Sequence, residues 1–191
     1  MGNFWKDIYD KKGNSSITDL LYLDGYEHLD TPFNSQDITQ KISFLLSLKK
    51  GFKILEIGCG CGFLARDLQH YNYTGIDYSE PINKKHKSLY PHHRVLTGEG
   101  SSLAFPDKSF DVVFCFGVFQ YLPSLTYADS TIKEMRRVAK KSIFLGDLKN
   151  VATRPEHFVY PKYKLKAQKF IFSECFYDPS NADRYNAHLT L

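Results

Sequence analysis

Three glycines and one aspartate carry the strongest chemical signal in the sequence. The segment Lys53–Ile57 is predicted to be a short strand, and it runs directly into Gly58-Cys-Gly-Cys-Gly62. At the carboxyl end of a strand in an open parallel sheet, such a loop lets the backbone approach a ligand closely. A second predicted strand, Tyr73–Asp77, ends in a carboxylate that is well placed to accept hydrogen bonds from ribose hydroxyls.

The same loop excludes two common phosphate-binding sites. A GxGxxG dinucleotide fingerprint that starts at Gly58 needs its third glycine where Phe63 stands. A P-loop is excluded because no Gly-Lys-Ser/Thr follows the glycines. A glycine loop without a phosphate-binding lysine, combined with a ribose-binding acid, indicates a nucleoside cofactor that carries no phosphates. S-adenosylmethionine is such a cofactor.

Four motifs resemble, in the same order, those of the class I S-adenosylmethionine-dependent methyltransferases. Glu56–Gly62 is similar to motif I of that family, and Gly75–Ser79 is similar to its second motif. Gly98–Asp111 resembles the GDAxxLPFxDxSFD stretch of the type 11 branch, and Phe114–Leu122 resembles the loop and helix after the fourth strand. The resemblance covers about residues 50–148 and implies an enzyme that uses S-adenosylmethionine and releases S-adenosylhomocysteine.

The resemblance also implies which residues bind the cofactor. Asp77 is expected to hold the ribose, Glu56 to orient the amino group, and Glu99 to stand where the family has an aspartate that accepts from the adenine. A glutamate at this position keeps the hydrogen-bond acceptor but has a longer side chain than aspartate. The full set of expected cofactor-binding residues is Glu56, Gly58, Cys59, Gly60, Gly62, Asp77, Tyr78, Glu99, Gly100, Cys115 and Phe116.

No motif identifies a catalytic residue, because methyl transfer depends largely on alignment and on the exclusion of water. The segment after the fifth predicted strand faces the acceptor in related enzymes, and it contains His157, which we predict to be a general base or a substrate contact. A surface or hydrogen-bonded core histidine is the alternative. The further substrate-binding candidates are Tyr9, Gln120, Arg154 and Tyr160.

The excess of positive charge lies in one segment. The chain has 25 Lys+Arg and 21 Asp+Glu, and the net charge is +4. Residues 149–169 hold six of the bases and only one acid, Glu156, although a solvated basic face would show the same pattern. The family has an amphipathic helix here, whereas residues 150–168 contain two prolines and a weak apolar pattern. We therefore hypothesise a small anionic acceptor, phosphorylated or carboxylated, that is methylated on oxygen or nitrogen.

Strands alternate with helices along most of the chain, which predicts a single Rossmann-like α/β domain with helices on both faces. The sheet is expected to have seven mostly parallel strands and an antiparallel C-terminal edge formed by Lys169–Tyr177 and Arg184–Leu191. Helices are expected from Asn34 or Ser35 to Lys49–Gly51, from the glycine loop to about His70, and over Glu80–Leu89. The nearly continuous apolar run Asp111–Phe116 is expected to form a strand buried on both faces, and Ser142–Gly146 a further strand. Residues 1–33 are expected to form a helical lid on a methyltransferase domain of residues 34–191.

Several other classes of protein are disfavoured. There is no apolar run of membrane-spanning length and no secretory signal, so we expect a cytoplasmic protein that does not contact a membrane. The spacing of Cys59 and Cys61 is too short for a usual zinc site, so no metal is expected. The Asn/Asp-Pro-Pro-aromatic signature of nucleic-acid methylases is absent after the fourth strand. A protein methyltransferase and a catalytically silent S-adenosylmethionine-binding subunit remain as alternatives to a small-molecule enzyme, and the oligomeric state is left open.

Overall fold

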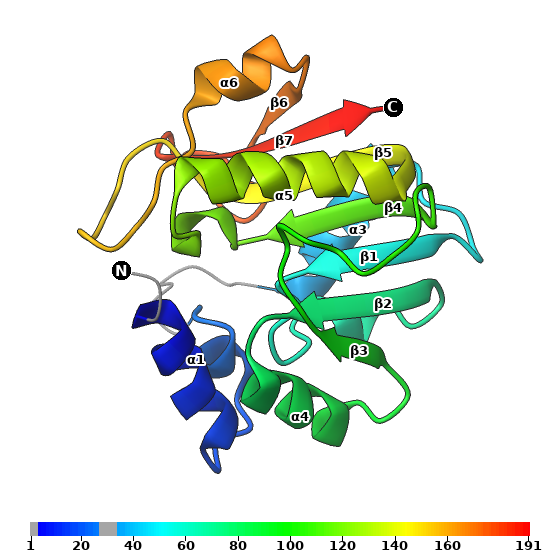
Figure 1. Ribbon diagram of the computed structural model, residues 1–191, viewed down its shortest axis with the longest axis vertical. Helices are drawn as coiled ribbons and strands as arrows, with labels where there is room; N and C mark the ends of the chain where they lie inside the picture. Colours follow the sequence, from blue (N-terminus) through cyan, green and yellow to red (C-terminus); the bar gives the residue numbers. More distant parts are fainter. Residues whose placement is uncertain (1–3, 27–33) are drawn as a thin grey trace.

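A seven-stranded sheet forms the centre of the molecule in the computed structural model, which describes residues 4–26 and 34–191 (Figure 1). The strand order is β3-β2-β1-β4-β5-β7-β6. The strands are β1 (Lys53–Ile57), β2 (Asn72–Asp77), β3 (Arg94–Thr97), β4 (Phe110–Phe116), β5 (Ala139–Lys149), β6 (Ile171–Glu174) and β7 (Arg184–Thr190). The first five run parallel to one another, and β7 is antiparallel to both β5 and β6. The predicted fold class is confirmed.

Helices cover both faces of the sheet. They are α1 (Phe4–Asn14), α2 (Leu20–Leu23), α3 (Ser35–Leu45), α4 (Glu80–Leu89), α5 (Leu125–Val138) and α6 (Lys162–Ala167), with 3-10 turns η1 (Ala65–Asp67) and η2 (Phe119–Tyr121). The apolar sides of α5 and α6 share one core cluster, whereas α3 and the segment around η1 share the other. Helix α1 packs on α4 beyond the β3 side of the sheet (Figure 1). Among the described helices, none is long and apolar enough to cross a membrane.

Two helix predictions were wrong. The segment after the glycine loop forms only the single turn η1, because β2 already begins at Asn72 and little chain is left for a crossover helix. Helix α3 ends at Leu45, before the predicted Lys49–Gly51. Ser47 there adopts a left-handed backbone, and the amide of Leu48 donates to the carbonyl of Ser43, a Schellman-type ending that usually uses glycine.

The region after β5 also differs from its prediction. Strand β5 extends to Lys149 and is longer than the predicted Ser142–Gly146, because it continues alongside β7 past a register shift. The expected edge strand Lys169–Tyr177 shortens to β6. The weak pattern of residues 150–168 yields α6, a six-residue helix. The long loop between β5 and α6 therefore belongs to no helix or strand and can line a site.

The packing of the core leads to one prediction about stability. Phe114 on β4 is fully buried between the strands and α3. We expect Phe114→Ala to lower the free energy of unfolding by about 3–5 kcal/mol, because it removes buried apolar surface and leaves a cavity. Phe44, whose side chain is 88% exposed, is the matched control. Phe44→Ala is expected to change stability by less than about 0.5 kcal/mol in the same urea titration, and equal effects would contradict the assigned core.

Candidate functional site

A cavity of about 590 Å³ lies at the carboxyl ends of β1, β2 and β4. Ten of the eleven residues predicted to bind the cofactor line it: Glu56, Gly58, Cys59, Gly60, Asp77, Tyr78, Glu99, Gly100, Cys115 and Phe116. Gly62 does not line the cavity. It ends the loop and faces α4, where an added Cβ would lie 2.9 Å from the imidazole of His86. The fold thus brings four separate sequence motifs to one hollow.

The glycine loop has a shape that side chains would prevent. The amides of Gly58 and Cys59 both donate to the carbonyl of Ile76, which fastens the loop to β2. Gly58 has a φ of +72°, and a Cβ there would lie 2.4 Å from a methyl carbon of Val118. Gly60 has a φ of +50° and faces the carboxylate of Asp24. At both positions a neighbouring side chain takes the space that a Cβ would need, so only glycine allows the loop to lie this close to Val118 and Asp24.

Asp77 ties the second strand to the loop. Its Oδ2 accepts a hydrogen bond from the amide of Gly60 at 3.2 Å, and its Oδ1 accepts one from the amide of Ser79 at 3.0 Å. Ser79 in turn caps the start of α4. Burial raises the pKa of Asp77 to about 6, against the lowering effect of these backbone donors. A carboxylate held in this way can accept further hydrogen bonds from hydroxyl groups in the cavity.

Glu56 is the second buried acid of the site. Its side chain is 3% exposed, and its Oε2 accepts a hydrogen bond from the hydroxyl of Tyr73 at 2.6 Å. Burial raises the pKa of Glu56 to about 8. Tyr73 orients this carboxylate from the neighbouring strand and was not among the predicted site residues.

A third acid, Asp24, was also missed by the sequence analysis. It follows α2, and its two oxygens accept hydrogen bonds from the amides of Cys61 at 2.6 Å and Phe63 at 3.0 Å. Asp24 lines the cavity, and burial raises its pKa to about 7. The N-terminal segment is thereby fastened to the glycine loop.

The far end of the cavity carries the residues expected near an adenine. Tyr78, Glu99 and Gly100 line it, and the hydroxyl of Tyr127 on α5 donates a hydrogen bond to Glu99. Tyr127 thus orients the longer glutamate side chain, a role that no sequence pattern indicates.

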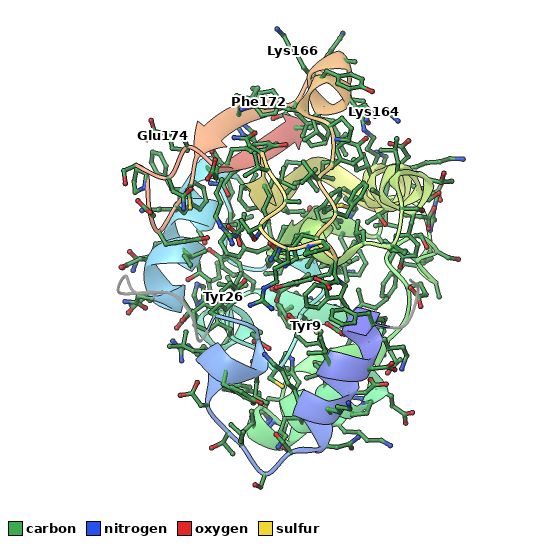
Figure 2. All side chains as sticks on the ribbon, turned by 90° about the vertical axis from the view of Figure 1, so that its left-hand side faces the viewer. Tyr9, Tyr26, Lys164, Lys166, Phe172 and Glu174 are labelled. Atoms are coloured by element: carbon green, nitrogen blue, oxygen red, sulfur yellow. The ribbon has the colours of Figure 1, made fainter. Side chains whose placement is uncertain are left out.

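The predicted acceptor residues divide into two groups. Tyr9 and His157 line the cavity, and Tyr9 lies with Tyr26 between the N-terminal helices and the sheet (Figure 2). Gln120, Arg154 and Tyr160 do not line it. The amide nitrogen of Gln120 donates to the carbonyl of Gly117, Tyr160 is a core residue whose hydroxyl donates to Asp129, and Arg154 is exposed to solvent. Gln120 and Tyr160 are thus buried, and each donates a hydrogen bond to another group of the chain.

His157 is not placed as a general base. Its Nδ1 lies 3.2 Å from Nζ of Lys149 and 3.0 Å from the hydroxyl of Thr153. Burial, together with the positive charges of Lys149, Arg154 and Arg184, lowers the pKa of His157 to about 4. The imidazole is therefore neutral at pH 7 and has little affinity for a second proton.

The fold and the site together are similar to those of the class I S-adenosylmethionine-dependent methyltransferases. Residues 55–145 match the family model of the type 11 branch, described as a methyltransferase domain, which confirms the resemblance seen in the motifs. The cofactor of this family is S-adenosylmethionine.

Curated relatives agree with this assignment over part of their length. The chain is 32% identical over 156 residues to the 2-methyl-6-phytyl-1,4-hydroquinone methyltransferase of Synechocystis, an alignment that covers 70% of this chain and 47% of that protein. It is 29% identical over 110 residues to a sterol 24-C-methyltransferase of Gibberella zeae, covering 53% of this chain and 28% of that protein. The chain thus spans under half the length of these relatives.

Solved structures show the same fold. The PH0226 protein from Pyrococcus horikoshii superposes with a TM-score of 0.65 at 18% identity, covering 82% of this chain and 89% of that one. The magnesium protoporphyrin IX methyltransferase of Synechocystis with bound S-adenosylmethionine gives a TM-score of 0.63 at 15% identity, covering 99% and 92%.

Proposed function

We propose that this chain transfers a methyl group from S-adenosylmethionine to an oxygen or nitrogen atom of a small molecule. The observation that carries the proposal is the meeting of the glycine loop, Asp77 and Glu99 in one cavity. When bound, the cofactor supplies a methyl group on a positively charged sulfur. The lining fits this group, because Asp24, Glu56 and Asp77 offer negative charge to a positively charged sulfur.

The N-terminal residues support the proposal that the segment of residues 1–33 acts as a lid. From the part that is described, Phe4, Trp5, Tyr9, Asp24 and Tyr26 line the cavity. Residues 1–3 and 27–33 lie outside the described residues. A lid that is fastened by Asp24 excludes water from the reacting groups, which strengthens electrostatic interactions inside the site.

The cavity supports a ring-bearing acceptor. Its walls beyond the glycine loop are aromatic and apolar, and they include Trp5, Tyr121, Leu122 and Phe158. Among the described lining residues, Lys6 is the single lysine or arginine. The names of two relatives, which specify a sterol and a hydroquinone, support the same class of acceptor.

The phosphorylated or carboxylated acceptor of the sequence hypothesis has less support. Arg154 is exposed, and Lys164 and Lys166 lie at the end of the molecule opposite Tyr9 (Figure 2). Lys164 is also paired with Asp129 at 2.6 Å. The positive charge that reaches the cavity wall comes instead from Lys149, behind His157.

Calorimetric titration with S-adenosylmethionine and S-adenosylhomocysteine tests the cofactor assignment. We expect both to bind with dissociation constants of about 1–100 μM. A screen for S-adenosylhomocysteine release, with phenolic and amine acceptors beside phosphorylated ones, then tests the acceptor class. If neither ligand binds, the proposed function is wrong. If both bind but no small molecule is methylated by the purified chain, a cofactor-binding subunit becomes the better description.

A further inference from the structure

The imidazole of His157 is held rigidly on the cavity wall. The indole of Trp5 stacks on it, with ring centroids 5.4 Å apart and planes at 15°. The ring of Tyr121 meets it edge-on at 6.0 Å. The indole nitrogen of Trp5 donates to the carbonyl of Glu156 at 3.2 Å, which fixes the stack to the chain next to His157. Helix α1 and the turn η2 therefore both contact the imidazole, which is carried by the loop after β5.

The neighbours of His157 determine which ring nitrogen carries the proton. Lys149 is only 6% exposed, and its ammonium lies 2.6 Å from Oγ1 of Thr153 and 3.2 Å from Nδ1 of His157. An ammonium group has donors only, so Nδ1 must accept a hydrogen bond. The hydroxyl of Thr153, which accepts from Lys149, lies 3.0 Å from the same atom. The proton of the neutral ring is then on Nε2, for which no partner is found among the described residues.

Charge is divided between the two ends of the cavity. Lys149, Arg154 and Arg184 are the cations that act on His157, and Glu156 is the opposing acid. Asp147 also lies nearby, but its Oδ1 is already paired with Arg184 at 2.5 Å and accepts from Tyr177 at 2.7 Å. The acids Asp24, Glu56 and Asp77 stand instead around the glycine loop. The His157 end is thus positive, and the loop end is negative.

We infer that Nε2–H of His157, with the ammonium of Lys149 behind it, forms a subsite for an ionised hydroxyl oxygen of a phenol or enol on a flat apolar ring. The inference rests on the proposed methyl transfer and names the acceptor class for it. His157 touches this oxygen as a hydrogen-bond donor, and Lys149 is the positioning residue that fixes its tautomer. An acceptor bound in this form needs no general base, because its proton has already passed to bulk water. The flat aromatic walls accommodate its ring.

The ionisation of 4-nitrophenol, whose phenolate absorbs visible light, tests the subsite without cofactor or turnover. We expect the apparent pKa of protein-bound 4-nitrophenol to be about one unit lower than that of the free compound. Lys149→Met removes the charge, and His157→Phe keeps the stacking ring but removes the donor. Both are expected to abolish most of the shift. Lys166→Met, an exposed lysine of the same basic segment, is the matched control and should retain it.

Each outcome decides the inference. Circular dichroism establishes whether each variant is folded. If one of the two site variants does not fold, the other is sufficient to test the subsite. An unshifted pKa, a failure of wild type to bind 4-nitrophenol, or a full shift in His157→Phe overturns the subsite. A full shift in Lys149→Met overturns the role of Lys149. Titration of the same samples with S-adenosylmethionine separates this failure from a failure of the proposed function, because cofactor binding without a shift rejects only the subsite.

Discussion

Replacing Asp77 by alanine is expected to weaken S-adenosylmethionine binding by about a hundredfold or more, since two charge-assisted hydrogen bonds of about 1.5–3 kcal/mol each are at stake. Part of this loss is direct, because the carboxylate faces the cavity where the ribose is proposed to lie. The rest comes from the loop, since the amide of Gly60 loses its acceptor.

Asparagine at position 77 separates charge from shape. Both oxygens of Asp77 accept backbone amides, from Gly60 and from Ser79. In Asp77→Asn one of these amides faces an NH₂ donor, so we expect more than a tenfold loss even though the size is preserved. Asp111 is the matched control. Its carboxylate accepts a hydrogen bond from the amide of Lys53 at the amino ends of β1 and β4, the ends opposite to the cavity. Asp111→Asn is expected to leave cofactor affinity unchanged in the same calorimetric titration. Wild-type affinity in Asp77→Asn would contradict the ribose assignment.

Local patterns in the sequence were sufficient to predict most elements that position the site. Helix α4 was predicted with its observed bounds, because its signals are all local: Ser79 caps the amide of Ile82, Pro81 stands in the first turn, and His86 and Lys87 stand in the last. The buried strand β4 was predicted from its continuous apolar run, as expected for a strand covered on both faces.

The residues that sequence reasoning missed make contacts across long separations or through irregular backbone. Asp24 accepts from the amides of residues 61 and 63, and Tyr127 donates back to Glu99. Lys149 contacts Thr153 and His157, which are only four and eight residues away but lie on irregular backbone. Neither periodicity nor spacing encodes such contacts. An Asp-Gly pair at residues 24–25 predicts a turn but not which loop its carboxylate binds.

The predicted substrate-binding residues show that the net charge of a segment is a poor guide to the charge of the site. The surplus of residues 149–169 is real, but most of its lysines lie on or beside α6, away from the cavity (Figure 2). Only the first of them, Lys149, is buried against the cavity wall. A sum over a segment cannot distinguish these positions, because the direction of each side chain depends on the strand and helix that carry it.

The affinity for S-adenosylmethionine is expected to rise from pH 6 to pH 8, and to rise more than the affinity for S-adenosylhomocysteine. Burial raises the pKa of Asp77 to about 6, of Asp24 to about 7 and of Glu56 to about 8. Each of these carboxyls is therefore partly neutral in this range and gains its charge as the pH increases. A cationic sulfur favours the charged form, whereas the neutral sulfur of the product does not, so the ratio of the two affinities should increase by about three- to tenfold.

The free protein is expected to respond in the opposite direction. An acid whose pKa is higher in the folded than in the unfolded state binds more protons when folded, so its contribution to stability is present below the unfolded value and is lost as pH rises through the folded value. For Glu56 that window runs from about pH 4.5 to pH 8. Without ligand, the free energy of unfolding should thus fall over the same range in which cofactor affinity rises.

Glu56→Gln distinguishes these linked effects from a general effect of pH. Glutamine keeps an oxygen that can accept from the hydroxyl of Tyr73 but does not titrate. The affinity ratio measured by calorimetry should therefore vary less with pH, and the fall in stability between pH 6 and pH 8 should become shallower in urea titrations. If the ratio stays constant with pH in wild type, the acids do not act on the sulfonium. If the ratio changes but Glu56→Gln behaves like wild type, Asp24 or Asp77 carries the effect, because both also gain charge in this range.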